Sequence, residues 1–388
     1  MSHISFKFRL NPTTSQSEKL SQIAGSCRFV FNYFLAMQKR LCEKRKETRD
    51  TSIKLLNYNQ TSEILTKLKQ EEPTSWLADS FAQSLQQSLM NLDKALKGWL
   101  TKKSRFPQFK KKGVRDSFKL PQLSPGFLNQ IDKTVKIPKV GTVHYKQDRM
   151  LVGTIRSANI SRDGDHWYIS ILTEQSENLD PHPSDKMVGI DVGVSYFLTL
   201  SSGTHINLPN SIKSLDSKIV SLQQRVSHKK KGSNNRKKAV RRLSTAYRKL
   251  RNIRLDFLHK TSTDIAKNHS YVVMENLKVV NMTKSARGTL EQPGKNVSAK
   301  RGLNRSIARQ SWSLFRGLLS YKLSNLNGEL RLVDPRYTSQ TCPVCLTVDK
   351  RNRKSQSKFE CVRCGHTNNA DVNAANNILR LGFLGSVV

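Results

Sequence analysis

Four cysteines in the C-terminal part of the chain have the spacing of a metal site. They follow the pattern C-x2-C-x15-C-x2-C, whose members are Cys342, Cys345, Cys361 and Cys364. Each C-x2-C pair can bring two thiolates to one ion, and four thiolates complete a tetrahedral shell that leaves no position open for water. We therefore expect one structural zinc ion at these cysteines. A redox-active pair is the alternative for either C-x2-C, but two such pairs at this distance favour zinc.

Three acidic residues stand where further chemistry could take place. Asp191 follows the apolar run "MVGI", Glu275 ends the apolar run "YVVME", and Asp371 opens the segment "DVNAANNIL". A buried carboxylate is costly unless a base or a metal ion lies close to it, and these apolar segments carry no matching base. We therefore expect the three acids to hold a divalent ion of the hard kind, which prefers oxygen ligands.

The overall charge indicates a polyanion as the partner. The 388 residues include 67 Lys and Arg against 29 Asp and Glu, which gives a formal net charge of +38. A membrane surface is also anionic, but the sequence has no apolar run near the ~18 residues of a membrane span and no signal-peptide pattern. Nucleic acid is therefore the first candidate partner, and we expect a reducing, cytoplasmic location.

Two stretches concentrate the cations. Residues 102–112 set two phenylalanines among basic residues, a mixture that can bind phosphates and stack on bases. Residues 225–254 hold thirteen Lys or Arg and no acid, so that self-repulsion is costly without a polyanion alongside. A solvated surface is the alternative for both stretches, and for the first one it is equally good. The candidate nucleic-acid contacts are Lys102, Lys103, Arg105, Lys110, Lys111, Arg236, Lys237, Lys238, Arg241 and Arg242.

The elements that must position these residues follow from hydrophobic periodicity. The opening "MSHISFKFRLNP" alternates like a strand, and apolar positions at helical spacing follow from Leu20 to Phe34. A second apolar stripe runs from Leu77 to Trp99 and predicts one long amphipathic helix. The N-terminal part of the chain therefore combines a strand with at least two helices.

After residue 118 the hydrophobic pattern changes from helical spacing to the alternation typical of strands. Short alternating runs between residues 118 and 173 predict antiparallel strands of a small barrel or sandwich, and the polar stretch 176–186, which contains two prolines, predicts a linker. Strands are then expected at "MVGID", "YVVME" and "ELRLV", and a helix at residues 312–326. The Lys-, Ser-, Gly- and Asn-rich stretch 282–305 predicts a mobile segment.

The motifs, in their order along the chain, resemble a known family. "GIDVG", "VMENLKV", "VDPRYTSQTCPVC" and "CGHTNNADVNAANNIL" are similar to motifs of the TnpB family of transposon-encoded RNA-guided DNA nucleases, OrfB-type proteins ancestral to type V CRISPR effectors. Near the N-terminus, "FKFRLNPT", "CRFVFNYFL" and "RFPQFKKK" look like the family's opening strand, its recognition helices and their junction. The resemblance covers nearly the whole chain.

This resemblance implies an α/β multidomain architecture. It consists of an N-terminal wedge β-barrel with an inserted helical recognition bundle, followed by a RuvC-like RNase H fold with an inserted zinc ribbon. On this basis the expected domains are the wedge β-barrel at 1–10 and 116–180, the helical recognition domain at 11–115, the RuvC-like nuclease domain at 186–339 and 367–388, and the zinc ribbon, which binds target nucleic acid, at 340–366.

The resemblance also implies an activity. The family's catalytic carboxylates correspond to Asp191, Glu275 and Asp371, which would hold two catalytic Mg²⁺ ions. The expected enzyme is an RNA-guided DNA endonuclease that cuts double-stranded target DNA next to a short flanking motif. Its guide RNA would come from the transposon end. The protein would be monomeric in the ribonucleoprotein and would act in the prokaryotic cytoplasm, at the nucleoid when bound to its target.

Two positions depart from the family pattern. Leu346 replaces the glycine often found after the first C-x2-C, which predicts an altered tight turn in the ribbon. Asn369 stands where many relatives carry an additional aspartate, so an accessory carboxylate outside the metal ligands is missing. All three catalytic acids are present.

Three other functions compete with this one. An RNA-guided regulator that binds DNA without cutting it is the first, and the intact trio of acids argues against it. A DDE-type transposase is the second, but the order Asp, Glu, Asp with a ribbon ahead of the last acid fits a RuvC-like site better. A basic zinc-ribbon protein that binds RNA or the ribosome is the third, and it would leave the three acids unexplained.

Overall fold

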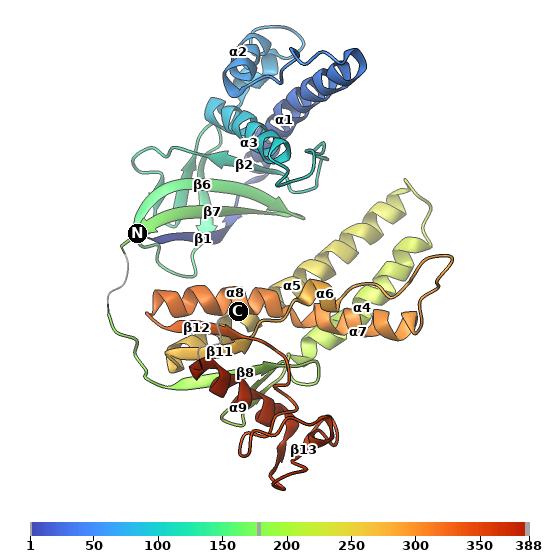
Figure 1. Ribbon diagram of the computed structural model, residues 1–388. Coiled ribbons are helices and arrows are strands. Elements are labelled where there is room, and N and C mark those ends of the chain that lie inside the picture. The colour runs from blue at the N-terminus through green and yellow to red at the C-terminus, as the bar shows by residue number, and fades with distance from the viewer. Residues whose placement is uncertain (1, 177–179, 385–388) are drawn as a thin grey trace. The chain divides into compact units, whose positions relative to one another are not determined.

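The chain forms two compact units (Figure 1). The computed structural model describes residues 2–176 and 180–384. The units are Met1–Glu177 and Asn178–Val388, so that their boundary falls inside the linker predicted at 176–186. Residues 177–179 of that linker lie outside the described residues. Within the described ranges, no helix has the length and apolar character that a membrane crossing needs.

The first unit is built on one antiparallel sheet. Its strands lie in the order β2-β6-β7-β1-β5-β4-β3, with β1 paired to β7 on one side and to β5 on the other. Alternate residues of β1, such as Phe6 and Phe8, are buried because successive side chains of a strand point to opposite faces. The strands are β1 (Ser2–Asn11), β2 (Ser117–Leu120), β3 (Leu128–Asn129), β4 (Thr134–Ile137), β5 (Gly141–Lys146), β6 (Thr154–Asp163) and β7 (His166–Gln175).

The sheet is curled into a half-barrel, which is the part of the predicted barrel that the described strands show (Figure 1). Among the described strands, β2 pairs with β6 alone and β3 with β4 alone. These two edge strands are four and two residues long.

Three α-helices complete the described part of this unit, residues 2–176: α1 (Thr14–Thr48), α2 (Tyr58–Leu68) and α3 (Ala82–Leu100). The predicted apolar face of α1 is confirmed and belongs to one core with Leu85, Leu89 and Leu92 of α3. The second predicted helix begins later than expected. Its first residues form a 3-10 turn, η1 (Ser75–Asp79), after which Ser80 is extended, and the Ser80 hydroxyl donates a 2.7 Å hydrogen bond to Ser26.

The second unit has three layers around a mixed sheet of order β10-β9-β8-β11-β12. β8, β11 and β12 are parallel, and β9 runs antiparallel to β8. Val188 and Ile190 of β8 pack with α5 and α8 on one face, while Val273 of β11 packs with α9 on the other. The strands are β8 (Met187–Val192), β9 (Leu198–Leu200), β10 (His205–Ile206), β11 (Tyr271–Glu275) and β12 (Glu329–Val333), which confirms the strands predicted here.

A long helical hairpin lies between β10 and β11 along the chain. It consists of α4 (Asn210–Ser227) and α5 (Asn234–Asn268), whose near parts share a small core around Ile212 and Leu250. The hairpin extends away from the sheet and carries the basic stretch at its far end (Figure 1). The stretch without acids, 225–254, therefore covers the end of α4, the turn and the first part of α5, and its Ala246 and Leu250 belong to the small core of the hairpin.

The helices after β11 correct one prediction. α6 (Val279–Met282), α7 (Val297–Gln310) and α8 (Trp312–Asn325) follow it, so residues 297–305 of the segment predicted as mobile are helical. Two side chains of α7 fasten it to the end of α6 and to the residue that follows. Asn304 donates a 2.9 Å hydrogen bond to the carbonyl of Thr283, and Lys300 donates one of 2.7 Å to the carbonyl of Met282. Tertiary contacts therefore override the polar composition.

The last part of the chain is a small ribbon followed by a helix. η2 (Lys350–Asn352), β13 (Lys358–Glu360) and β14 (Thr367–Asn369) precede α9 (Ala370–Phe383). Phe359 is fully buried in a cluster with Cys342, Cys361 and Ala370. Because Ala370 is the first residue of α9, the ribbon packs directly on the start of that helix.

Candidate active site and metal centre

Two of the three acids lie side by side at the ends of neighbouring parallel strands. Ile190 of β8 is level with Met274 of β11, so the next residues, Asp191 and Glu275, are level too. Both follow residues that face α5 and α8, and strand alternation therefore turns both carboxylates to the face covered by α9. Adjacent strands lie ~4.8 Å apart, which places the two acids as direct neighbours.

Close packing brings α9 to the same point. Gly189 lies beneath α9, and a Cβ atom at this position would overlap the carbonyl of Ala375. Ala374 and Ala375 are buried, as expected for small residues that allow a helix to approach a sheet. The first glycine of "GIDVG", Gly189, is therefore required because no side chain fits beneath the helix. Asp371 lies in the first turn of α9.

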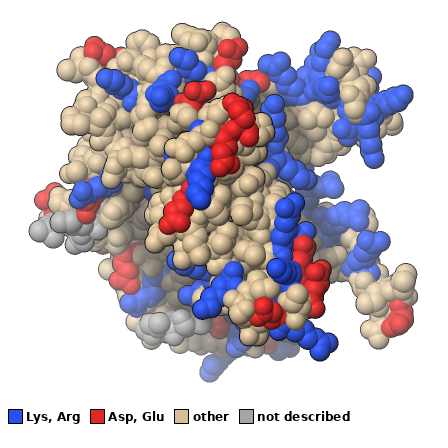
Figure 2. All heavy atoms as spheres, turned by 90° about the horizontal axis from the view of Figure 1, so that it is seen from above, with Lys and Arg blue, Asp and Glu red and all other residues tan. Residues whose placement is uncertain are grey.

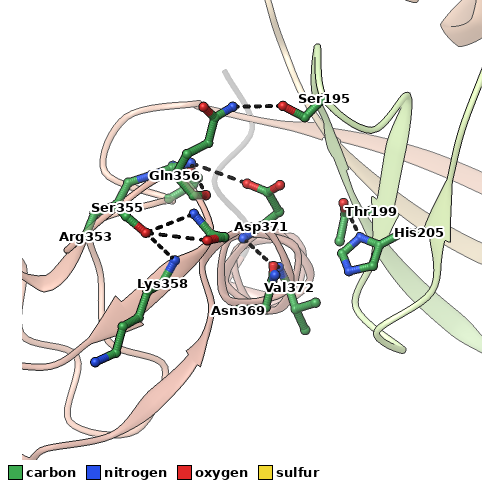
Figure 3. A network of polar contacts seen from close by, with 12 residues as sticks. Ser195, Thr199, His205, Arg353, Ser355, Gln356, Lys358, Asn369, Asp371 and Val372 are labelled. Carbon is green, nitrogen blue, oxygen red and sulfur yellow. Dashed lines mark hydrogen bonds and ion pairs between the residues drawn. The ribbon is translucent and has the colours of Figure 1, made fainter.

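The third acid has a partner that sequence reasoning missed (Figure 3). Arg353 of the ribbon donates a 3.3 Å hydrogen bond to Asp371, and Gln356 from the same segment donates one of 3.0 Å to Ser195 after β8. Asn369 caps α9 by accepting hydrogen bonds from the amides of Asp371 and Val372. Asn369 therefore serves as a neutral helix cap, which holds the backbone of Asp371 in place.

The carboxylates of Glu275 and Asp371 lie close enough to Asp191 to disfavour its ionisation. Burial, together with the charges of Glu275 and Asp371, raises the pKa of Asp191 from 3.8 to about 7, and Arg353 opposes this shift. Burial also raises the pKa of Glu275, although Thr338 donates a 2.6 Å hydrogen bond to its carboxylate. Two buried acids whose pKa values are raised, with the carboxylate of Asp371 beside them, are a suitable ligand set for a divalent cation, which would compensate their charges.

This crowding should be measurable as a stability cost. A raised pKa in the folded state means that the folded protein binds the proton more tightly than the unfolded chain, so ionisation of Asp191 lowers stability as the pH rises from about 4 to about 7. We expect metal-free Asp191→Asn to be more stable than the wild type at pH 8 by roughly 1 to 3 kcal/mol, and by little at pH 4. Thermal melts in a chelator across this pH range test it. Asp256→Asn, at an exposed position of α5, is the control. A stability difference between Asp191→Asn and the wild type that is the same at all pH values would contradict the prediction.

The four cysteines that were predicted to bind zinc lie together in the ribbon. Their sulfur atoms all lie within 4.8 Å of one another, with 3.6 Å between Cys342 and Cys364 and 3.5 Å between Cys345 and Cys361. Bonds of ~2.3 Å in a tetrahedron require sulfur atoms ~3.8 Å apart, so the cluster fits zinc. In the described part of the chain this is the one group of three or more ligating side chains so close together, and the three acids do not form a second such group.

Comparison with known proteins agrees with this arrangement. Residues 170–286 match a family model described as "Probable transposase" (OrfB_IS605), residues 312–378 one described as "Cas12f1-like, TNB domain", and residues 1–47 a "Helix-turn-helix domain". The chain is 43% identical over 377 residues to a protein of Escherichia coli K12 named "Putative RNA-guided DNA endonuclease InsQ", an alignment that covers 97% of this chain and 92% of the relative. The chain belongs to the TnpB family. A Streptomyces pristinaespiralis relative of this TnpB protein, also named as an RNA-guided DNA endonuclease, is 30% identical over 98% of the chain and 90% of its own length.

The fold of this TnpB protein is similar to that of a solved nuclease. A Cas12f1 chain, in a complex with guide RNA and target DNA, matches 94% of this chain and 82% of its own length with a TM-score of 0.53 at 15% identity. At this identity the match concerns the fold alone. Within the N-terminal match, residues 2–47 form β1 and most of the single helix α1.

The ribbon of this TnpB protein contains a strained turn. Leu346 follows the first C-x2-C with a φ of +58°, and Gly365 occupies the equivalent place after the second with +71°. The amides of both residues donate 3.0 Å hydrogen bonds to the first cysteine of their pair. Leu346 was predicted to alter this turn, but its backbone has the same left-handed conformation as that of Gly365. Leu346 has a Cβ atom, which makes this conformation sterically costly.

Relief of this strain should stabilise the ribbon. We expect Leu346→Gly to raise the free energy of unfolding of the zinc-loaded ribbon by about 0.5 to 1 kcal/mol, after the greater freedom of glycine in the unfolded chain is deducted. Competition with a zinc chelator measures it. Leu346→Ala removes the same half-exposed side chain but keeps the strained backbone, so equal zinc retention in the two variants would show that strain is not the cause.

The basic candidates lie on the surface of both units. Figure 2 shows Lys and Arg in excess of Asp and Glu over the visible face. Lys102, Lys103, Arg105, Lys110 and Lys111 are exposed in the loop between α3 and β2, whereas Arg236, Lys237, Lys238, Arg241 and Arg242 lie in the first turns of α5 and all but Arg236 are exposed. The structure thus gives two separate basic surfaces.

Proposed function

We propose that this TnpB family member is an RNA-guided DNA endonuclease whose active site consists of Asp191, Glu275 and Asp371. The level placement of Asp191 and Glu275 under the start of α9 supports this proposal most strongly. The names of the relatives, RNA-guided DNA endonucleases that match nearly the full chain, support the same activity.

In the proposed reaction, the three carboxylates would hold two Mg²⁺ ions. Such ions activate a water molecule and stabilise the leaving oxygen of a phosphodiester. Asp191 would hold the metal together with Glu275 and Asp371, because both of these carboxylates lie close enough to raise its pKa. Thr338 orients Glu275 by hydrogen bonding, and the Asn369 cap orients Asp371.

The domain assignment is part of this proposal. We assign residues 1–10 and 116–180 to a wedge domain, 11–115 to a recognition domain, 186–339 and 367–388 to a RuvC-like nuclease domain, and 340–366 to the zinc ribbon. The strand order with α5 and α8 on one face of the sheet and α9 on the other supports the RuvC-like assignment. The cluster of four cysteines supports the ribbon.

The proposed partners are a guide RNA from the transposon end and double-stranded target DNA beside a short flanking motif. Base pairing would select the target, while cations hold the nucleic-acid backbones. We place the protein in the prokaryotic cytoplasm and treat it as a monomer in the ribonucleoprotein. The net charge of +38 supports the simultaneous binding of RNA and opened DNA.

A plasmid assay tests this function. The protein is purified with its copurifying RNA, the RNA is sequenced, and a plasmid with a matched target and randomised flanking sequence is incubated with and without Mg²⁺. We expect Mg²⁺-dependent cutting of matched plasmids only. Binding of the matched target without cutting would instead favour the RNA-guided regulator.

The basic tip of the α4–α5 hairpin should contribute to this binding through phosphates. We expect joint replacement of Arg236, Lys237, Lys238, Arg241 and Arg242 by Gln to weaken RNA binding and to flatten its salt dependence by up to ~0.7 to 0.9 per lost contact. Titrations at several salt concentrations measure the slope. Replacement of five exposed cations of α1 (Lys39, Arg40, Lys44, Arg45 and Lys46) is the charge-matched control, and an unchanged slope in the hairpin variant would assign this tip to solvated surface.

A further inference from the structure

The first unit contains a hollow that the proposed nuclease site does not use. It has a volume of about 600 Å³ and lies on α1, with η1 at its edge. Three aromatic rings line it, those of Phe29, Tyr33 and Trp76, together with polar side chains of Gln22, Arg28 and Asn32. This size and this mixture of aromatic surface with a few polar groups are typical of ligand sites.

The aromatic rings form a platform that is open to solvent. The centroids of Phe29 and Trp76 lie 5.2 Å apart at an angle of 65°, and those of Phe29 and Tyr33 lie 5.8 Å apart at 29°. Trp76 is 43% exposed, although an indole ring gains much from burial. The Phe29 ring meets Trp76 edge to face and leaves the indole partly uncovered, and such an exposed ring can stack on a flat partner.

The rim of the hollow is basic. Asn32 exchanges two hydrogen bonds with the backbone of Lys110, of 2.9 and 2.8 Å, and thereby fastens the basic stretch 102–112 beside the platform. Lys110 also places its ammonium group 4.0 Å from the ring centroid of Phe31. Arg28, which lines the hollow, is paired with Asp116 at 2.7 Å, and the exposed Lys111 and Lys112 follow directly after Lys110 along the chain.

We propose that this hollow binds one unpaired nucleobase of a nucleic-acid strand, with the base stacked on Trp76 and the adjoining phosphate at Lys111 and Lys112. A flat aromatic ligand with a negative charge at one side complements a ring platform with cations at one edge. The choice of a nucleic acid as the occupant rests on the proposed function, but the hollow lies in the first unit and uses none of the three acids.

Photocrosslinking tests this site. The full chain, freed of copurifying nucleic acid, is irradiated with hexamers of 5-iodouridine or 5-iododeoxyuridine, and the attached peptide is located by mass spectrometry. We expect attachment at Trp76 or its ring neighbours. Attachment of the RNA hexamer assigns the hollow to the guide and that of the DNA hexamer to the target, and either supports the proposal. Attachment of neither hexamer to these rings would overturn it.

Binding titrations give a second measurement. We expect Trp76→Ala to weaken hexamer binding by about 5- to 100-fold, the range for loss of one stacked ring, without a change in the salt slope, because no phosphate contact is lost. Trp76→Phe should retain most of the affinity, and Tyr321→Ala, at a similarly exposed ring of the second unit, should bind as the wild type does. Equal affinity of Trp76→Ala and wild type for both hexamers would contradict the proposal. A plasmid that stays uncut while the hexamers still attach at Trp76 would contradict the nuclease function alone.

Discussion

Asp191→Ala should abolish DNA cleavage while guide and target binding persist. Loss of one ligand from a site that holds two metal ions removes several kcal/mol of transition-state stabilisation, which corresponds to a rate loss of about a thousandfold or more. Binding depends on base pairing and on distant cations, and removal of a negative charge close to DNA should leave it equal or slightly tighter. Asp191→Asn should be equally inactive, because the amide keeps the shape but lacks the charge that attracts Mg²⁺.

Plasmid cleavage and gel shift, run in parallel on the copurified ribonucleoprotein, measure the two quantities. Glu275→Ala and Asp371→Ala should behave like Asp191→Ala, whereas Asp256→Ala removes an exposed carboxylate of α5 and should cut like the wild type. Cleavage that survives in all three site variants would refute the RuvC-like assignment.

Cys361→Ser should cause the loss of the zinc ion and, with it, of cleavage. Four thiolates close the predicted shell, and the free energy of zinc binding in such sites is also folding free energy. Cys361 and Phe359 pack on Ala370, so a ribbon without zinc no longer holds the start of α9, and Asp371 moves away from its partners although no acid has changed.

Metal analysis of the purified chain measures the zinc content, and hydrogen exchange of the peptides from 340 to 384 measures the loosening. Cys42→Ser, at a half-buried cysteine of α1 outside the cluster, should keep both the zinc and the activity. Stoichiometric zinc and full activity in Cys361→Ser would rule out the proposed ligand set.

Elements with strong local patterns could be predicted from the sequence. The strands at Asp191 and Glu275, the helix that begins at Asp371 and the four-cysteine cluster follow from apolar runs and from spacing, and the structure contains all of them. The break at Ser80 could not be read from the continuous apolar stripe, because it depends on a hydrogen bond to a distant helix.

Contacts between distant parts of the chain could not be predicted from the sequence either. Arg353 lies in a run of basic residues typical of a solvated loop, and nothing local distinguishes it from Arg351 or Lys354. Its contact with Asp371 arises only when the ribbon folds against α9. Thr338, which donates to Glu275, was likewise an ordinary loop residue until the turn after β12 placed it there.

The pairing of β8 with β11 also has a consequence for how the chain folds. The two strands are adjacent in space, yet the whole α4–α5 hairpin separates them along the chain. Closing so long a loop costs entropy before any parallel pairing repays it. The hairpin can form from local contacts first and bring the two strands together. We therefore expect mutations in its small core at Ile212 and Leu250 to slow refolding of the second unit, although they lie in no proposed ligand set.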